Sequence, residues 1–455
     1  MTSCWLPQMV DAALAAQRKI VQFARDDGGD APTAADFDAL GLQLPIDGTR
    51  SNAPYLNAIN DALKSTSISA THVQTPEQLQ GLIIAAQHVL DAANGTPGDG
   101  SPEPTAADFL ALGLAKSKID NAGAVGVAML ADTVDASTLR ALTTDENGKA
   151  IALPDKLAGL LDLIQSLIVT AAGGVANPPL DAVQLGKLGV NLAGVAHNAD
   201  GTLQNWPAIF AAIAGSKKDG SDVNTLDKLQ ALVNDADVSQ AKIRLFADDA
   251  VSATDPLTTP TVDDYHNIGL VNPVADATGL GLVGTGTAPE VSATTLNALM
   301  AAIKALTPAD VDTMAELKSV AAAARAAQDK IRQYADAQTS GAVAPAGSDP
   351  MTPVAKDFAD MGVSGISNFK TPTPDRSDGM PAGLFTVLSA LATSAVDGKR
   401  TATADLVQGI VDSANKLLAL ADGRANTPAN QPSLEDFRLL GADLSSLGKA
   451  AIKTD

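Results

Sequence analysis

The chain has little of what disulfide-rich domains and nucleic-acid-binding proteins use. Its 455 residues include one cysteine, Cys4, so no internal disulfide can form, and CxxC metal motifs are absent. The alternatives for Cys4 are a cross-link between two chains and an unused thiol near the terminus. Aromatic residues make up only 3% of the chain, and 31 basic residues face 52 acidic ones. The net charge of −21 would repel a phosphate backbone, which argues against nucleic-acid binding.

Targeting signals and long apolar runs are also scarce. Residues 1–7 have neither a basic region nor an apolar stretch, so we expect no signal peptide and no lipid attachment at Cys4. The most apolar segment, 157–175, carries Asp162 and Gln165 and ends in a glycine pair. This pattern indicates a buried helix, and we expect no membrane insertion.

What the chain does have is a motif that recurs six times, the mark of a repeat architecture. A capping residue is followed three positions later by Asp or Gln, a pattern that satisfies free N–H groups at a helix start. The closing glycine suits the left-handed turn that ends a helix. We therefore expect short, self-capped helices with the residue four positions before the glycine in the core. These anchors, each with its glycine, are Phe37 and Gly41, Phe109 and Gly113, Leu185 and Gly189, Tyr265 and Gly269, Phe358 and Gly362, and Phe437 and Gly441.

Two further helical segments follow the motif. The middle segments have apolar residues three and four positions apart, which is typical of a short amphipathic helix. Examples are 55–63, 206–213, 296–303 and 384–391. The long segments start at sequences such as Thr75-Pro76, with proline at the first helical position. Their ends carry Lys19-Ile20, Lys242-Ile243 and Lys330-Ile331.

These elements predict an all-α fold of tandem three-helix repeats (short helix, middle helix, long helix), arranged as an elongated helical array or as linked bundles. A lone long helix precedes the complete repeats and a lone short helix follows them. These incomplete units at the two ends fit either a piece of a longer array or a subunit whose ends are completed by neighbouring copies packed head to tail. The predicted divisions are 1–30 (long helix only), repeats 1 to 5 at 31–95, 96–175, 176–250, 251–340 and 341–424, and 425–455 (short helix only).

Repeat 1 carries a family resemblance. Its run of Pro32-Thr-Ala-Ala-Asp-Phe-x-Ala-Leu-Gly41, then Asn57-Ala-Ile-Asn-Asp-Ala-Leu63, then Thr75-Pro-Glu-Gln-Leu-Gln resembles the alanine-rich helical repeats of very large bacterial surface and adhesin-like proteins. Through its repeats, the resemblance covers essentially the whole chain. It implies a structural or adhesive role at the cell surface, with neighbouring copies of the chain or further repeats of a longer chain as partners. Contacts to the cell surface or its matrix would follow.

Residues that could carry chemistry do not converge. The motif aspartates recur once per repeat, whereas a catalytic group would occur once, so we interpret them as caps. The glycines of 279–284 fit the spacing of a dinucleotide loop but lack its strand and helix, so chance explains them better. The histidines fall at different repeat positions, and we expect them to be exposed. The aspartates are Asp36, Asp108, Asp264, Asp357 and Asp436, and the histidines are His72, His88, His197 and His266.

We therefore predict that the chain is not an enzyme and has no catalytic residues, cofactor or resident metal. The acidic loops at 26–30 and 248–249 lack the spacing of a calcium-binding loop and would support weak calcium association at most. The alternative to a surface array is a soluble helical-repeat binding module for a protein or peptide ligand. A surface patch present in only one repeat would favour that alternative.

Overall fold

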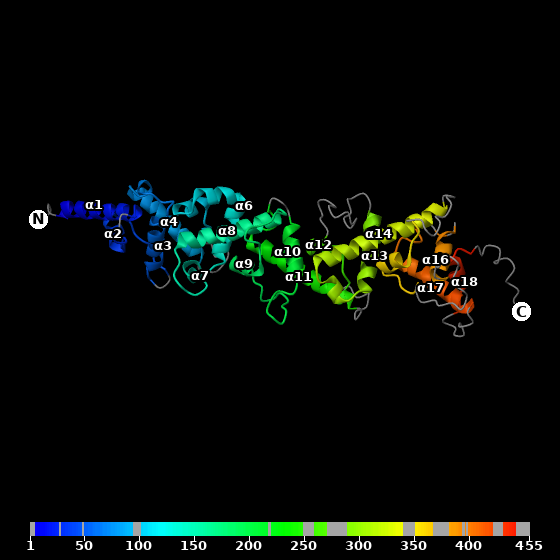
Figure 1. The fold of residues 1–455 in the computed structure, drawn as a ribbon. Coiled ribbons are helices and arrows are strands. Elements are labelled where there is room, and N and C mark those ends of the chain that lie inside the picture. Colours follow the sequence, from blue (N-terminus) through cyan, green and yellow to red (C-terminus); the bar gives the residue numbers. More distant parts are fainter. Residues whose placement is uncertain are drawn as a thin grey trace. The chain divides into compact units, whose positions relative to one another are not determined.

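The computed structural model confirms the all-α prediction: the regular elements of the described residues are helices (Figure 1). Isolated bridges join Thr144 to Ala150 and His197 to Leu203. In the part of the chain that is described, no helix is both long and apolar enough to cross a membrane. The structure describes residues 5–26, 29–47, 50–93, 102–216, 220–248, 259–270, 289–339, 351–366, 382–393, 396, 399–421 and 431–442.

The chain divides into two compact units, of which the first contains Met1–Gln204 and Ile213–Asn234. Within it, α1 packs against α2 and α3, α4 against α3 and α5, and α8 against α6 and α7. Its helices are α1 (Trp5–Ala24), α2 (Ala34–Ala39), α3 (Ala53–Leu63), the 3-10 helix η1 (Ala70–His72), α4 (Pro76–Ala92), α5 (Ala106–Ala111), α6 (Lys116–Asp135), α7 (Leu139–Thr143), α8 (Leu153–Ala171) and α9 (Ala182–Lys187).

The second compact unit contains Asn205–Ala212 and Asp235–Asp455, so α10 (Trp206–Ala214) and α11 (Leu226–Ala247) are each shared between the units. One core cluster of the second unit joins α13 to α17, with alanines such as Ala302 and Ala324 allowing close helix approach. Its other helices are α12 (Val262–Asn267), α13 (Pro289–Lys304), the 3-10 helix η2 (Pro308–Val311), α14 (Met314–Thr339), α15 (Ala355–Asp360), α16 (Ala382–Leu391), α17 (Ala404–Ala421) and α18 (Leu434–Leu439).

Glycine residues interrupt or end two of the predicted helical segments. The segment α6, which follows the motif of predicted repeat 2, is interrupted at Gly123, whose φ of +62° is not helical, so two helical stretches meet at this residue. The segment 157–175 forms a buried helix as predicted: α8 buries Leu157, Ile164 and Leu167 and ends at Ala171, just before the glycine pair, and Val175 beyond it is 94% exposed. Gly173 adopts a φ of +76°, a left-handed conformation that stops the helix before the apolar run is over.

Candidate functional site

The six motif helices end in one and the same turn. In each copy the residue after the glycine donates its N–H to the carbonyl of the anchor, as from Leu42 to Phe37 at 3.0 Å and from Val363 to Phe358 at 2.9 Å. The glycine N–H bonds to the residue three positions before it, and every motif glycine has a φ between +73° and +97°. This is a Schellman ending, and the left-handed φ is the reason glycine stands there.

The starts of these helices are nearly as uniform. In the first copy the backbone N–H and the hydroxyl of Thr33 both donate to a carboxylate oxygen of Asp36 at 2.7 Å. The second, fourth and sixth copies repeat this geometry, and the third replaces it with Asp181 and Gln184. In the fifth copy the N–H of Val354 donates to Asp357 at 2.7 Å, but valine has no hydroxyl, so only half of the capping box forms.

Five of the six anchors are fully buried, and the sixth is not. Phe37, Phe109, Leu185, Tyr265 and Phe358 are each 0% exposed. Phe437 is only half-buried among the described residues. The described chain has no helix after α18 to complete its cover, whereas a middle helix follows each of the other motif helices.

The motif aspartate is also bound from outside the motif, by the long helix that precedes it. The Lys330 ammonium lies 2.8 Å from a carboxylate oxygen of Asp357, and we call such a pair a lock. At the other locks the donor–acceptor distances lie between 2.7 and 3.1 Å. The other locks are Lys19 with Asp36, His88 with Asp108, Lys242 with Asp264, and Lys416 with Asp436.

Sequence reasoning missed these locks, although a signal for them exists. The recurring Lys-Ile at the ends of long helices and the recurring Asp of the motif each occur about once per repeat, which is the pattern of a paired interaction. The third copy supports this interpretation. There Gln184 replaces the aspartate, and α8 carries no basic residue except Lys156 near its start, so both partners are absent together.

His88 is half-buried and takes the place of a lock lysine, so the expectation that all four histidines are exposed is wrong for this residue. His72, His197 and His266 are exposed. Within the described residues, no group of His, Cys, Asp and Glu side chains is arranged to hold a metal ion. Cys4, the glycines of 279–284 and parts of both acidic loops lie outside the described residues.

Hydrogen bonds favour the charged form of three lock aspartates, Asp36, Asp264 and Asp436. Burial raises the pKa of Asp36, Asp264 and Asp436, but hydrogen bonds from the lysine and from the capping residue outweigh burial, so each pKa lies below its ordinary value. A partly exposed ion pair contributes about 0–1 kcal/mol. The locks therefore serve the register between helices more than the total stability.

A glutamine two residues before the lock residue adds a second link. Gln328 donates to the backbone carbonyl of Ala402 at 2.6 Å, in the loop that leads into the next long helix. Gln17 does the same to Val73 at 2.9 Å. Gln240 repeats the bond to Val311 at 2.7 Å. The segment Gln-x-Lys-Ile thus binds two elements of the following predicted repeat.

Middle helices seat against the motif glycines. A Cβ built on Gly362 would overlap the backbone carbonyl of Ala301 in α13, and one on Gly269 would overlap that of Ala211 in α10. At Gly41 a Cβ would meet nothing within 4 Å. The same turn is therefore packed closely against a middle helix in some copies and faces open space in the first copy.

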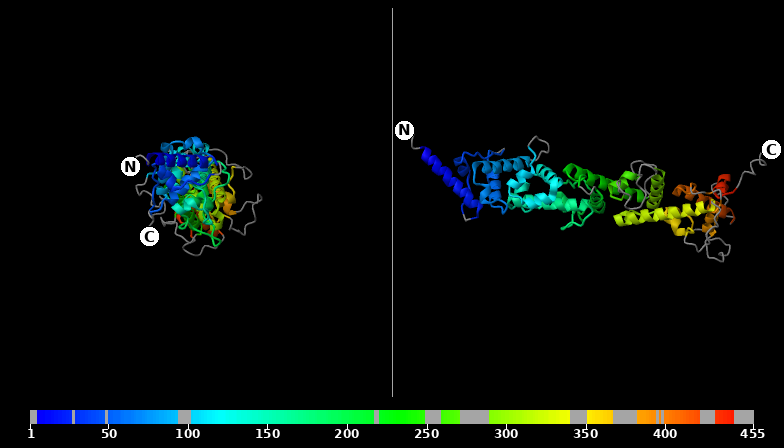
Figure 2. Two further views of the ribbon diagram at one scale, coloured as in Figure 1. Left: turned by 90° about the vertical axis from the view of Figure 1, so that its left-hand side faces the viewer. Right: turned by 90° about the horizontal axis from the view of Figure 1, so that it is seen from above.

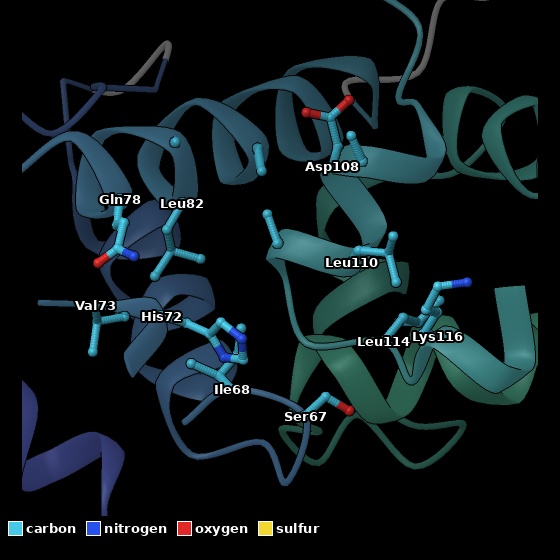
Figure 3. Close-up of a pocket in the computed structure, with 14 residues that line it drawn as sticks. Ser67, Ile68, His72, Val73, Gln78, Leu82, Asp108, Leu110, Leu114 and Lys116 are labelled. Atoms are coloured by element: carbon cyan, nitrogen blue, oxygen red, sulfur yellow. The ribbon is translucent and has the colours of Figure 1, made fainter. Parts of the chain in front are cut away.

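A cavity of about 610 Å³ opens between α4 and α5 in the first compact unit (Figure 3). Its charged groups have partners: Asp108 accepts from its own cap, and Lys116 donates to Asp120 at 2.6 Å. The cavity thus offers mainly apolar surface, with its charged groups already engaged. Its apolar wall is formed mainly by Ile68, Val73, Leu82, Leu110 and Leu114.

Comparisons of this chain with models of protein families, with curated proteins and with solved structures give no match.

Proposed function

We propose that this chain is a non-enzymatic structural or adhesive repeat protein of the bacterial cell surface, working with neighbouring copies or further repeats as partners. The observation that carries the proposal is the lock, which ties a long helix to the short helix of the following repeat. Five locks recur along the chain, for example Lys330 with Asp357. A group that recurs once per repeat serves a scaffold better than a single catalytic centre.

The long helices α4, α14 and α17 support this proposal because each of them packs against the middle helix before it and the motif helix after it. The helix α14 packs against α13 of its own predicted repeat and against α15 of the next, and α4 does the same with α3 and α5. Such nearest-neighbour packing makes stability grow with the number of repeats. A chain of this kind suits a stalk, layer or fibre at the bacterial surface.

A truncation series tests the repeat scaffold. Chains ending at residues 340 and 250 would be compared with the chain ending at residue 424 by urea unfolding. We expect the free energy of unfolding to fall by a similar increment at each step, because each cut removes one repeat and one interface. A collapse of the whole chain after the first cut would contradict the scaffold and indicate one cooperative globular domain.

The location needs its own experiment. Intact cells that produce the protein would be treated with protease, and the chain would then be followed by immunoblotting alongside a cytoplasmic control protein. We expect the chain to be cleaved while the control protein stays whole. Protection of the chain until the cells are lysed would contradict a surface role.

The cavity between α4 and α5 favours a second candidate, a soluble binding module for a protein or peptide ligand. Its size falls in the range of pockets that hold small ligands or side chains. Peptides would be selected on the full chain and re-tested on Ala111→Trp, which fills the cavity, with the exposed Val183→Trp as control. Binding lost only in Ala111→Trp would support this candidate, and the absence of enriched peptides would count against it.

A further inference from the structure

The junction of α4 with α5 has a counterpart at the junction of α17 with α18. Each long helix packs against the motif helix that follows it, as Figure 1 and Figure 2 show. In α4 the capping residue is Thr75 and the lock residue is His88. In α17 they are Thr403 and Lys416, at the same separation in the sequence. The two junctions can therefore be aligned residue by residue.

The alignment shows that the cavity between α4 and α5 is space that a leucine fills at the other junction. Gly81 corresponds to Gly409, and Ala111 corresponds to Leu439. A Cβ built on Gly409 would lie 4.0 Å from a methyl carbon of Leu439, an ordinary van der Waals contact. At Gly81 a Cβ would meet nothing within 4 Å. The α4–α5 junction thus has the same frame without the leucine side chain.

His72 adds a hydrogen-bond donor to this mainly apolar space. Figure 3 shows its ring across the cavity from Leu110. Nδ1 of the ring accepts the backbone N–H of Ser69 at 3.1 Å, so the neutral ring carries its proton on Nε2. None of the described residues accepts a hydrogen bond from that N–H. Because Gly81 is exposed, the cavity is open to solvent on the side of α4.

We propose that this cavity binds a leucine side chain of a peptide ligand, with a backbone carbonyl oxygen of the peptide accepting a hydrogen bond from Nε2 of His72. The leucine takes the place that Leu439 has at the α17–α18 junction, and burial of its apolar surface drives binding. A peptide suits both features, because every residue carries a carbonyl oxygen next to its side chain. The proposal rests on the second candidate function, the binding module, and names its ligand.

The test uses the full chain and two small probes, N-acetyl-leucine N-methylamide and the corresponding alanine compound. The chain has 4 histidines, so the Cε1 proton of His72 can be followed by proton NMR in heavy water, with His72→Gln to assign its signal. The probes differ only in the side chain that the cavity is proposed to hold. Any difference between them therefore reports on the leucine.

Two variants of the chain complete the design. Ala111→Leu fills the cavity with the residue that α18 carries at this position, and the α17–α18 junction shows that the frame accommodates it. Val183→Leu is the matched control, because Val183 is 65% exposed on α9. We expect Ala111→Leu to raise the melting temperature by about 2–4 °C, since it buries a leucine side chain, and Val183→Leu to leave it unchanged.

We expect the leucine probe to shift the His72 signal saturably in the wild type and in Val183→Leu, with a Kd on the order of millimolar. Binding should be at least about tenfold weaker for the alanine probe and for Ala111→Leu. No saturable shift, or equal binding in either comparison, would overturn the site. A lower melting temperature of Ala111→Leu would also overturn it, because the cavity would then not accept a leucine. Self-association of the free chain that Ala111→Leu abolishes would overturn the peptide as occupant in favour of a second copy.

The peptide selection on the full chain separates a failure of this ligand from a failure of the binding module. Enriched peptides that need the open cavity, but keep their affinity when leucine is replaced by alanine, would remove the leucine and leave the module. An absence of enriched peptides would count against the module itself. The truncation series uses neither peptide nor probe, so the repeat scaffold stands or falls independently of both.

Discussion

The turns at Gly362 and Gly41 are alike in backbone and unlike in surroundings. Their φ angles are +77° and +74°, and in each the following residue donates its N–H to the carbonyl of a fully buried phenylalanine. Yet Gly362 lies against the backbone of Ala301, and Gly41 faces open space. The motif sequence thus determines the turn locally, while the neighbouring middle helix determines how much room the turn has.

The largest expected effect contrasts a covered anchor with a partly covered one. Phe109→Ala should lower the free energy of unfolding by about 3–5 kcal/mol, the usual range for a buried aromatic. Phe437→Ala should cost less than about 2 kcal/mol, because its ring is only half-buried. Urea unfolding of both variants checks this. Equal costs would mean that Phe437 is covered in solution as completely as Phe109.

Replacing the two glycines tests the comparison directly. Gly41→Ala should cost about 1–2 kcal/mol, the penalty of a left-handed conformation for a residue with a Cβ. Gly362→Ala should cost about 2–5 kcal/mol, since an overlap with the Ala301 carbonyl is added. Thermal and urea unfolding would measure both. A Gly41 variant as damaging as the Gly362 variant would show that the space beside Gly41 is filled.

Tyr265 is an anchor whose hydroxyl lacks a partner. Its Oη is buried and makes no hydrogen bond with the described residues, and burial raises the pKa of this phenol well above its ordinary value. Tyr265→Phe should therefore stabilise the chain by about 1 kcal/mol. Tyr55→Phe is the control: Tyr55 donates to Asp91 at 2.5 Å, and its loss should destabilise. Destabilisation by Tyr265→Phe would contradict the missing partner.

The smallest expected effect is a loss of folding stability in acid, which should be similar at the lock of Asp36 and at the lock of Asp264. Asp36 and Asp264 both have lowered pKa values, so the unfolded chain binds more protons than the folded chain in acid. Their stabilisation is present above the ordinary pKa of 3.8 and falls as the pH drops through the folded-state value. Lys19→Met should flatten this loss in urea titrations between about pH 7 and pH 3, whereas Lys118→Met, which breaks the exposed pair with Asp162, should not. A pH dependence unchanged by Lys19→Met would contradict the lock.

The parts of the fold that sequence could predict are those made by near neighbours in the chain. The caps at Thr33 and Thr105 and the glycine turns depend on residues three to five positions apart, so their spacing is visible in the sequence. The all-α class follows from the same periodicity. The interruption of α6 at Gly123 could not be predicted, because a single glycine inside an apolar pattern does not by itself indicate a non-helical residue.

The locks and the open space beside Gly41 depend on contacts between residues that are far apart in the sequence. Lys330 and Asp357 are 27 residues apart, and no local rule pairs them. The sequence indicates this pairing only through repetition: the lysine and the aspartate each recur about once per predicted repeat. The exposure of Phe437 depends on which helices stand beside it, which is a property of the folded assembly of helices and not of the motif.

Because the lysine–aspartate locks are chemically equivalent, whole repeats can be deleted from or duplicated in the gene with the locks preserved. Deleting residues 243–330 would join α11, up to and including Lys242, to the end of α14 and the segment that leads to Asp357, so that Lys242 and Asp357 would form a complete lysine–aspartate pair at the new junction. Duplication of the same stretch would likewise create one more junction of the same kind. Unequal recombination could therefore lengthen or shorten such a protein in whole-repeat steps without leaving a carboxylate unmatched.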